Sequence, residues 1–152
     1  MLGGCRGKEA LLAIAERKNR FPCLRTVKDK KSSSIMEALR SIQEEFGASF
    51  EEFFETITTD NGTEFSRLPE LEEGRRLPIY YAHPYCPSDK GMIENMNRII
   101  RRFIPKGKRL EDCTADEIMM IQQWLRDLPR KKLGYHTAQE CFLNECRKAS
   151  LC

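Results

Sequence analysis

Two carboxylates, Asp60 and Glu94, are the residues whose types and spacing best fit a chemical role. Asp60 follows the β-branched run 56–59 and precedes Asn61-Gly62, so it is expected at the carboxyl end of a short strand. Glu94 lies in the first turns of a predicted helix, with 33 residues between it and Asp60. Open α/β sheets place functional sites at such strand ends, and two converging carboxylates favour a hard cation such as Mg²⁺. The alternative interpretation is two ordinary surface acids.

The helix that carries Glu94 also carries groups suited to phosphate. Arg98 and Arg101 share the helical face of Glu94, Arg102 adjoins that face, and Asn97 lies one turn away. A metal-binding acid there would lie beside phosphate-binding cations. The alternative is an exposed ion pair between Glu94 and Arg98, worth only about 0.2–0.5 kcal/mol. Further basic residues indicate either a DNA backbone contact or a solvated turn: Lys106, Lys108, Arg109 and the run 130–132.

Composition and charge limit the class of protein. The chain has 152 residues, of which 40% are hydrophobic and 32% charged, so it is neither disordered nor a membrane protein, and we expect one domain over 1–152. Residues 1–32 carry 9 basic and 3 acidic groups, 33–76 carry 4 and 11, and 90–152 carry 13 and 8. Basic flanks attract a phosphate backbone, although a solvated face has the same composition. The absence of a leader-like or membrane-spanning run predicts a cytoplasmic location, and the seven cysteines, without a CxxC pair, predict reduced thiols.

The pattern of elements around the two acids indicates an α/β fold. Residues 9–17 and 21–28 are predicted to form a hairpin, with Pro22 placing the second strand at an edge. Three capping boxes are predicted: Ser34 with Glu37, Thr114 with Glu117 and Thr137 with Glu140. The remaining predictions are strands at 56–59 and 78–83 and helices at 34–47, 90–103, 114–128 and 137–148.

Four segments in this order resemble the catalytic core of bacterial transposases of the insertion-sequence-thirty type. They are Thr59–Phe65, Tyr81–Tyr85, Asp89–Asn97 and Arg101–Gly107, and the similarity extends over nearly the whole chain. The resemblance implies the fold of the retroviral-integrase-like superfamily. That fold is ribonuclease-H-like, with a mixed five-stranded sheet flanked by helices.

The resemblance also implies a chemistry. In that family three acids bind two divalent ions, and Asp60 matches the second acid and Glu94 the third. Mg²⁺ or Mn²⁺ held there would activate water or a DNA 3′-hydroxyl for displacement at a phosphodiester, with transposon ends and target DNA as partners. The candidate DNA contacts are Asn97, Arg98, Arg101, Arg102, Lys106 and Lys108. Asn61 and His83 are further candidates, although turn geometry and a strand-end backbone bond explain these two residues as well.

One feature of the family is missing from the sequence. The family's first acid lies on the first strand, just ahead of residues 9–17, and no Asp or Glu precedes Glu9 here. We therefore expect a core that lacks the first strand and an amino-terminal helix-turn-helix domain, with negligible cleavage by the chain alone. The open sheet edge is expected to pair with another copy or with a full-length transposase. The alternative function is a non-catalytic remnant that binds DNA or a full-length transposase.

Overall fold

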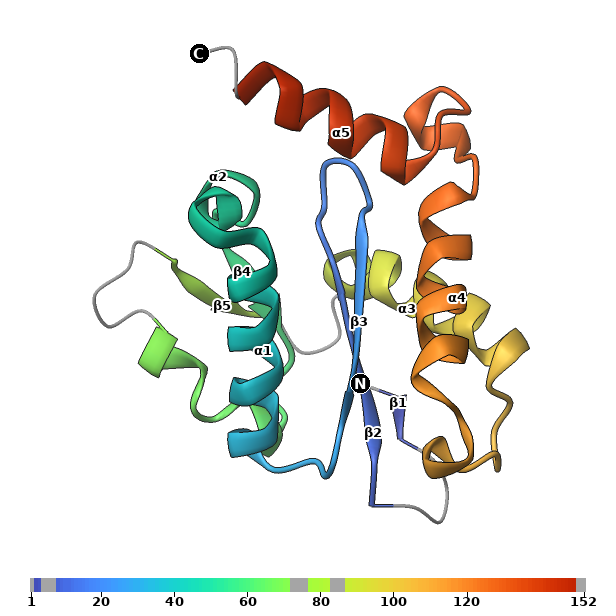
Figure 1. The fold of residues 1–152 in the computed structure, drawn as a ribbon. Helices are drawn as coiled ribbons and strands as arrows, with labels where there is room; N and C mark the ends of the chain where they lie inside the picture. Colours follow the sequence, from blue (N-terminus) through green and yellow to red (C-terminus); the bar gives the residue numbers. More distant parts are fainter. Residues whose placement is uncertain (1, 4–7, 72–76, 83–86, 150–152) are drawn as a thin grey trace.

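Five strands and five α-helices occur in the computed structural model, which describes residues 2–3, 8–71, 77–82 and 87–149. Their bounds are β1 Leu2–Gly3, β2 Ala10–Ala15, β3 Pro22–Val27, α1 Ser32–Phe46, α2 Phe50–Phe53, β4 Ile57–Thr59, β5 Ile79–Tyr81, α3 Pro87–Phe103, α4 Ala115–Asp127 and α5 Ala138–Ala149 (Figure 1). Short 3-10 turns occur at 47–49, 63–65, 68–71, 110–112 and 131–133. No helix in these ranges is long and apolar enough to span a membrane.

The strands form two separate sheets. In the first, β1, β2 and β3 are antiparallel, with Leu2 opposite Leu11 and Ala13 opposite Leu24. In the second, β4 and β5 are parallel, with Ile57 opposite Ile79. The predicted hairpin is therefore confirmed, and it is preceded by a two-residue strand that the sequence did not predict.

Helices cover both faces of the antiparallel sheet (Figure 1). Because side chains alternate along a strand, Leu11 packs against α3 and α4, whereas its neighbour Leu12 packs against α1. The apolar period of α3 supplies Met96 and Ile100, both buried in the same cluster as Leu11. The result is a three-layer arrangement of helix, sheet and helices, as an α/β fold requires.

The outer edge of β3, the edge that faces away from β2, is closed by side chains of α4. The backbone N–H of Leu24 donates to Oε1 of Gln122 at 2.7 Å, and Nε of Arg126 donates to the carbonyl of Pro22 at 3.3 Å. Pro22 has no N–H to offer, so its place on this edge costs no ladder hydrogen bond. The predicted edge position of Pro22 is confirmed.

Two of the three predicted capping boxes are present. The side chain of Thr114 accepts from the N–H of Glu117, and the carboxylate of Glu117 accepts from the N–H of Thr114. The same reciprocal pair joins Thr137 and Glu140 at 3.0 and 2.9 Å. Each box satisfies two backbone donors at a helix start, which fixes where α4 and α5 begin.

The capping box predicted at Ser34 is wrong. The hydroxyl of Ser34 donates instead to the carboxylate of Asp29 at 2.6 Å, which also accepts from the N–H of Lys31. Helix α1 consequently begins at Ser32, two residues before the predicted start. Its predicted end is confirmed, since Gly47 adopts a positive φ of 56° that favours glycine.

Free thiols occur at Cys23, Cys113 and Cys141, which agrees with the predicted reduced state of these three cysteines. Cys23 on β3 is fully buried beneath the aromatic cluster. Burial raises the pKa of this thiol from 9.0 to about 11, because the charged thiolate is poorly solvated there. Cys23 is therefore a core residue without nucleophilic character.

Candidate functional site

A cavity of about 700 Å³ separates the two sheets. One wall is the edge of β2 that faces away from β3, and the opposite wall is β4. Apolar side chains also line it, among them Leu39 and Ile42 of α1, Phe54, and Ile93 of α3. Charged residues border it as well, including Glu16, Glu145 and Lys148. The cavity therefore lies inside the sheet layer rather than on the surface of a helix.

Asp60 lies at the border of this cavity, directly after β4. The preceding residue, Thr59, accepts a backbone hydrogen bond from Ala82 at 2.7 Å, which extends the parallel ladder to the end of the strand. The side chain of Asp60 is exposed. The predicted placement at a strand's carboxyl end is confirmed.

Glu94 lies on α3, one residue after a segment that borders the same cavity. Met92 and Ile93 line the cavity together with Asp60, whereas Glu94 itself is exposed. Within the described ranges no ion pair joins Glu94 to Arg98, and the guanidinium of Arg98 instead donates to Oδ1 of Asn95 at 2.8 Å. The alternative of an intrahelical pair is therefore wrong.

The fit of a metal to this region rests on the chemistry of the donors. Nowhere in the part of the chain that the structure describes do three Asp, Glu, His or Cys side chains gather closely enough to hold a metal ion. Asp60 and Glu94 offer carboxylate oxygens, the donors that Mg²⁺ prefers, and such a pair would leave coordination positions for water and phosphate. The two residues thus have the donor chemistry that a magnesium site uses.

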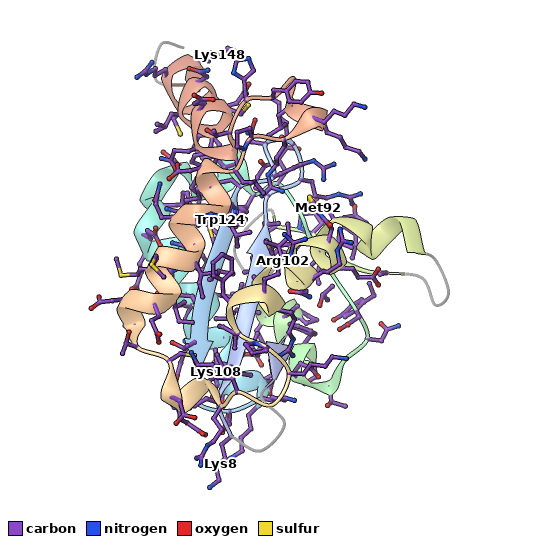
Figure 2. The ribbon with its side chains drawn as sticks, turned by 90° about the vertical axis from the view of Figure 1, so that its right-hand side faces the viewer. Lys8, Met92, Arg102, Lys108, Trp124 and Lys148 are labelled. Carbon is purple, nitrogen blue, oxygen red and sulfur yellow. The ribbon has the colours of Figure 1, made fainter. Side chains whose placement is uncertain are left out.

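The candidate DNA contacts differ in their surroundings. Arg98, Arg102 and Lys106 are exposed. Lys108 is partly buried, and its Nζ lies 3.9 Å from a carboxylate oxygen of Glu117. This acid partly neutralises the charge of the lysine. Figure 2 shows Arg102 on α3 and Lys108 on the turn that follows, on one side of the molecule, with Lys148 at its far end. The exposed cations therefore follow α3 toward its carboxyl end.

Two other candidates on α3 point partly inward. Arg101 and Asn97 are partly buried, and the buried Oδ1 of Asn97 has no hydrogen-bond partner within the described ranges. A buried carbonyl oxygen without a partner is costly, which marks Asn97 as unusual on this helix. The sequence indicated Asn97 as a DNA contact from its position on the helix alone.

The three residues of the basic run 130–132 differ in how exposed their side chains are. Lys131 and Lys132 are exposed, but Arg130 is half-buried and its Nη2 donates to the carbonyl of Leu125 at 3.1 Å. Burial, followed by the nearby charge of Arg20, lowers the pKa of this guanidinium. Arg130 therefore supports the end of α4, and the assignment of the run to the DNA backbone stays a prediction. His83 lies outside the described residues, and Asn61 is exposed.

Solved integrase cores have the same arrangement of elements. The catalytic core domain of BIV integrase matches with a TM-score of 0.70 over 94% of this chain and 91% of that chain, at 16% sequence identity. The catalytic core domain of HTLV-2 integrase, solved in complex with magnesium in a trimeric form, matches with a TM-score of 0.52 over 90% and 97%, also at 16% identity. The chain therefore has the ribonuclease-H-like fold of integrase catalytic cores.

Sequence relatives define the chain more closely, although no family model matches it. The transposase for insertion sequence element IS4351 of Bacteroides fragilis is 33% identical over 139 residues, which are 89% of this chain and 40% of the relative. The InsI transposase for IS30C of Escherichia coli is 28% identical over 130 residues, which are 86% of this chain and 33% of the relative. The chain is a homologue of insertion-sequence transposases, as the sequence motifs indicated. It spans 40% or less of the length of these relatives.

Proposed function

We propose that this chain is the catalytic core of a DNA transposase, in which Asp60 and Glu94 are two of the metal-binding acids. The observation that supports the proposal most is that Asp60 and the segment before Glu94 border one cavity in a fold shared with integrase cores. We also propose a single domain over 1–152, because β2 contributes side chains to the clusters on both faces of the sheet. The cytoplasmic location stays a prediction.

Each residue has its own role in this proposal. Asp60, fixed by the β4 ladder, and Glu94, fixed by the buried face of α3, would hold Mg²⁺ or Mn²⁺. A divalent ion there supplies Lewis-acid stabilisation of a phosphodiester and of the attacking oxygen. Arg98 and Arg102, exposed on α3, would hold the DNA backbone in position, since guanidinium groups pair well with phosphate. DNA, and for assembly other transposase chains, are the proposed partners.

One observation favours a second candidate function. The described residues supply no group of three metal ligands near Asp60. A site with only two acids would bind a metal loosely and cut DNA negligibly, and the chain would then act by binding DNA or a full-length transposase. The two candidates share the same surface and differ in metal-dependent cleavage.

Metal binding by the chain itself is the first test. Titration with Mn²⁺, followed by water-proton relaxation, is expected to show weak binding that Asp60→Asn and Glu94→Gln each reduce. The matched control is Glu64→Gln, which removes an acid four residues beyond Asp60. Equal binding by all four proteins would contradict the assignment of the two acids.

Cleavage is the second test. A form with an aspartate-bearing strand joined ahead of Met1 is expected to nick a transposon-end duplex with Mg²⁺ or Mn²⁺ and to stop on addition of chelator. Asp60→Asn or Glu94→Gln should lower nicking roughly a hundredfold or more, because each amide keeps the shape but removes the charge. Glu64→Gln should retain activity. Chelator-sensitive nicking by the unmodified chain that depends on Asp60 would show that a residue within 1–152 completes the site.

A further inference from the structure

Three elements meet at one end of the molecule: the turn between β2 and β3, the end of α4 and the first turns of α5 (Figure 1). Nε of Arg126 on α4 donates to the carbonyl of Pro22 at 3.3 Å, and the guanidinium carbon of Arg126 lies 4.2 Å from the ring centroid of Phe21. The ring of Phe21 also stacks on that of Phe142 of α5, with 4.1 Å between the centroids. The turn is therefore held against both helices.

Three arginines at this junction, Arg20, Arg126 and Arg130, form what we call the arginine cluster. Arg20 belongs to the turn, Arg126 lies in the last turn of α4, and Arg130 follows that helix. All three side chains are partly buried. Burial and then the charge of Arg20 lower the pKa of the Arg130 guanidinium, because a nearby like charge disfavours the protonated form. The cluster thus concentrates positive charge where water screens it only in part.

No ion pair within the described ranges neutralises a member of the arginine cluster. The acids nearest in sequence bind other groups. The carboxylate of Glu16 accepts from the backbone N–H groups of Lys18 and Asn19. The carboxylate of Asp127 accepts from the side-chain amide of Gln123. The positive charge of the cluster is therefore left for a negative group from outside the described residues.

Part of the hydrogen-bonding capacity of the cluster is also unused. A guanidinium carries five N–H donors. Nη2 of Arg130 donates to the carbonyl of Leu125, but Nε of Arg130 and Nη2 of Arg126 are buried without a hydrogen-bond partner in the described part of the chain. Buried donors without acceptors cost free energy. An anion at the partly exposed edge of these groups would therefore stabilise the junction.

The backbone fixes the position of Arg20. Its φ is 59°, in the left-handed region that residues other than glycine rarely adopt. The turn is secured on both sides of it, since the buried Asn19 donates its N–H to Glu16 and the N–H of Glu16 donates to the carbonyl of Phe21 at 2.9 Å. Such a conformation persists only where the surroundings hold it. Arg20 is therefore presented at the junction by a fixed turn.

We propose that the arginine cluster binds a phosphate group of a DNA backbone, at a site separate from Asp60 and Glu94. Guanidinium groups bind phosphate through paired N–H donors, and a phosphate supplies both the negative charge and the acceptors that the cluster lacks. No member of the cluster lines the cavity that Asp60 borders. The inference rests on the proposed function only for the source of the phosphate.

The residues beside the cluster favour a phosphate within a chain over a free phosphate ion. Lys131 and Lys132 follow Arg130 directly and are exposed. Together with the cluster they carry more positive charge than one free ion would neutralise. Tyr135 is 71% exposed, and its N–H donates to the carbonyl of Arg130 at 3.0 Å, so the same loop also presents an aromatic ring. Neighbouring phosphates and a base or sugar of one DNA strand would contact these groups.

NMR of the arginine Nε–H groups tests the proposal on the chain as it exists. Titration with a short DNA duplex at constant salt is expected to shift the signals of Arg20 and Arg130 and to saturate. The reference is Arg40, which is exposed on α1, the helix on the opposite face of the sheet from α4. Its signal should not move. Inorganic phosphate, added at the same ionic strength, distinguishes a free ion from the DNA backbone.

A variant of Arg20 gives a second measurement. Arg20→Asn keeps a residue that tolerates the left-handed region, so it should fold, as a thermal melt checks. It should weaken duplex binding about tenfold and reduce the slope of log K against log salt by about 0.9, the value for one phosphate contact. Arg20→Lys retains the charge and should restore the slope. Arg40→Gln is the matched control and should leave affinity and slope unchanged.

Four outcomes would overturn the proposal. A duplex that shifts Arg102 but neither Arg20 nor Arg130 would show that DNA binds elsewhere and would leave the proposed function intact. Shifts with inorganic phosphate alone would show a site for free ions. Shifts that grow with protein concentration without DNA would show that another copy supplies the negative group. Equal slopes for Arg20→Asn and Arg40→Gln would also contradict it. A failure of metal-dependent cleavage, in contrast, would leave all these measurements unaffected.

Discussion

The two edges of the β2–β3 hairpin differ in the partners that their backbone N–H and C=O groups have. On the outer edge, α4 supplies an acceptor for the N–H of Leu24 and a donor for the carbonyl of Pro22. On the inner edge, the edge of β2 that faces away from β3, Ala13 and Ala15 direct the same kinds of backbone group into the cavity, because residues opposite each other in an antiparallel ladder either both face or both avoid the partner strand. Among the described residues, the chain closes the outer edge with its own side chains and leaves this part of the inner edge without a strand partner. Backbone polar groups need partners, so water in the cavity is the expected partner of Ala13 and Ala15.

The largest effect is expected in the apolar layer that holds α4 against the closed edge. Leu125 is fully buried among residues of β2, β3, α3 and α4. Leu125→Ala should lower the free energy of unfolding by about 2–5 kcal/mol, from lost burial and the cavity left behind. Leu143→Ala, at a position 44% exposed on α5, is the control and should change it by less than about 0.5 kcal/mol in urea melts.

A smaller effect is expected when the closed edge is opened. Gln122→Ala removes the acceptor of the Leu24 N–H and should cost about 1–3 kcal/mol in urea unfolding, because a partly buried donor loses its partner. The amide of Leu24 should then exchange faster. Gln123→Ala is the matched control, since the amide of Gln123 only donates to the exposed Asp127. An unchanged Leu24 exchange rate in Gln122→Ala would show that another group closes this edge.

Alkaline pH should lower the free energy of unfolding because of the buried thiol of Cys23. The pKa of Cys23 is about 11 in the fold against 9.0 for the free group, so between these values the unfolded chain releases a proton that the folded chain keeps. Stability should therefore fall as pH rises from about 9 to about 11. Cys23→Ala should flatten this part of the profile. A slope that is the same in both proteins would contradict the burial argument.

The smallest expected effect is a change in the salt dependence of DNA binding. Binding to non-specific duplex should weaken as salt rises, and Arg102→Gln should reduce the slope of log K against log salt by about 0.9, the value for one phosphate contact. Lys28→Gln, which changes an exposed lysine that follows β3, pairs with Glu37 and lies outside the cavity lining, should leave the slope unchanged. Equal slopes in all three proteins would remove Arg102 from the interface.

Short sequence patterns were sufficient to predict most of the helices and strands. The boxes at Thr114 and Thr137, the stop at Gly47 and the apolar run of β2 each depend on a few neighbouring residues. Ser34 was misassigned because α1 begins two residues earlier, at Ser32, so Ser34 lies inside the first turn, where its hydroxyl donates to Asp29. Three consecutive serines offer several possible helix starts, and the pattern of apolar residues does not choose among them.

The site was predictable in part for the same reason. The β-branched run and the turn residues place Asp60 at a strand end without reference to the rest of the chain. The roles of Gln122 and Arg130 depend on packing between α4 and other elements, so their residue types gave no signal beyond an amphipathic helix. The cavity between the sheets is bordered by β2 and β4, which are far apart in sequence, so no local sequence pattern indicates it.

Hydrogen exchange of the chain alone tests the contrast between the two edges most directly. Leu24 and Ala13 lie opposite each other, and their N–H groups point to opposite edges. In dilute monomeric protein we expect the amides of Leu24 and Ile14 to be protected, with those of Ala13 and Ala15 exchanging at least roughly tenfold faster through local exposure. Protection of Ala13 and Ala15 equal to that of Leu24 would show that the inner edge is already closed and would contradict the account.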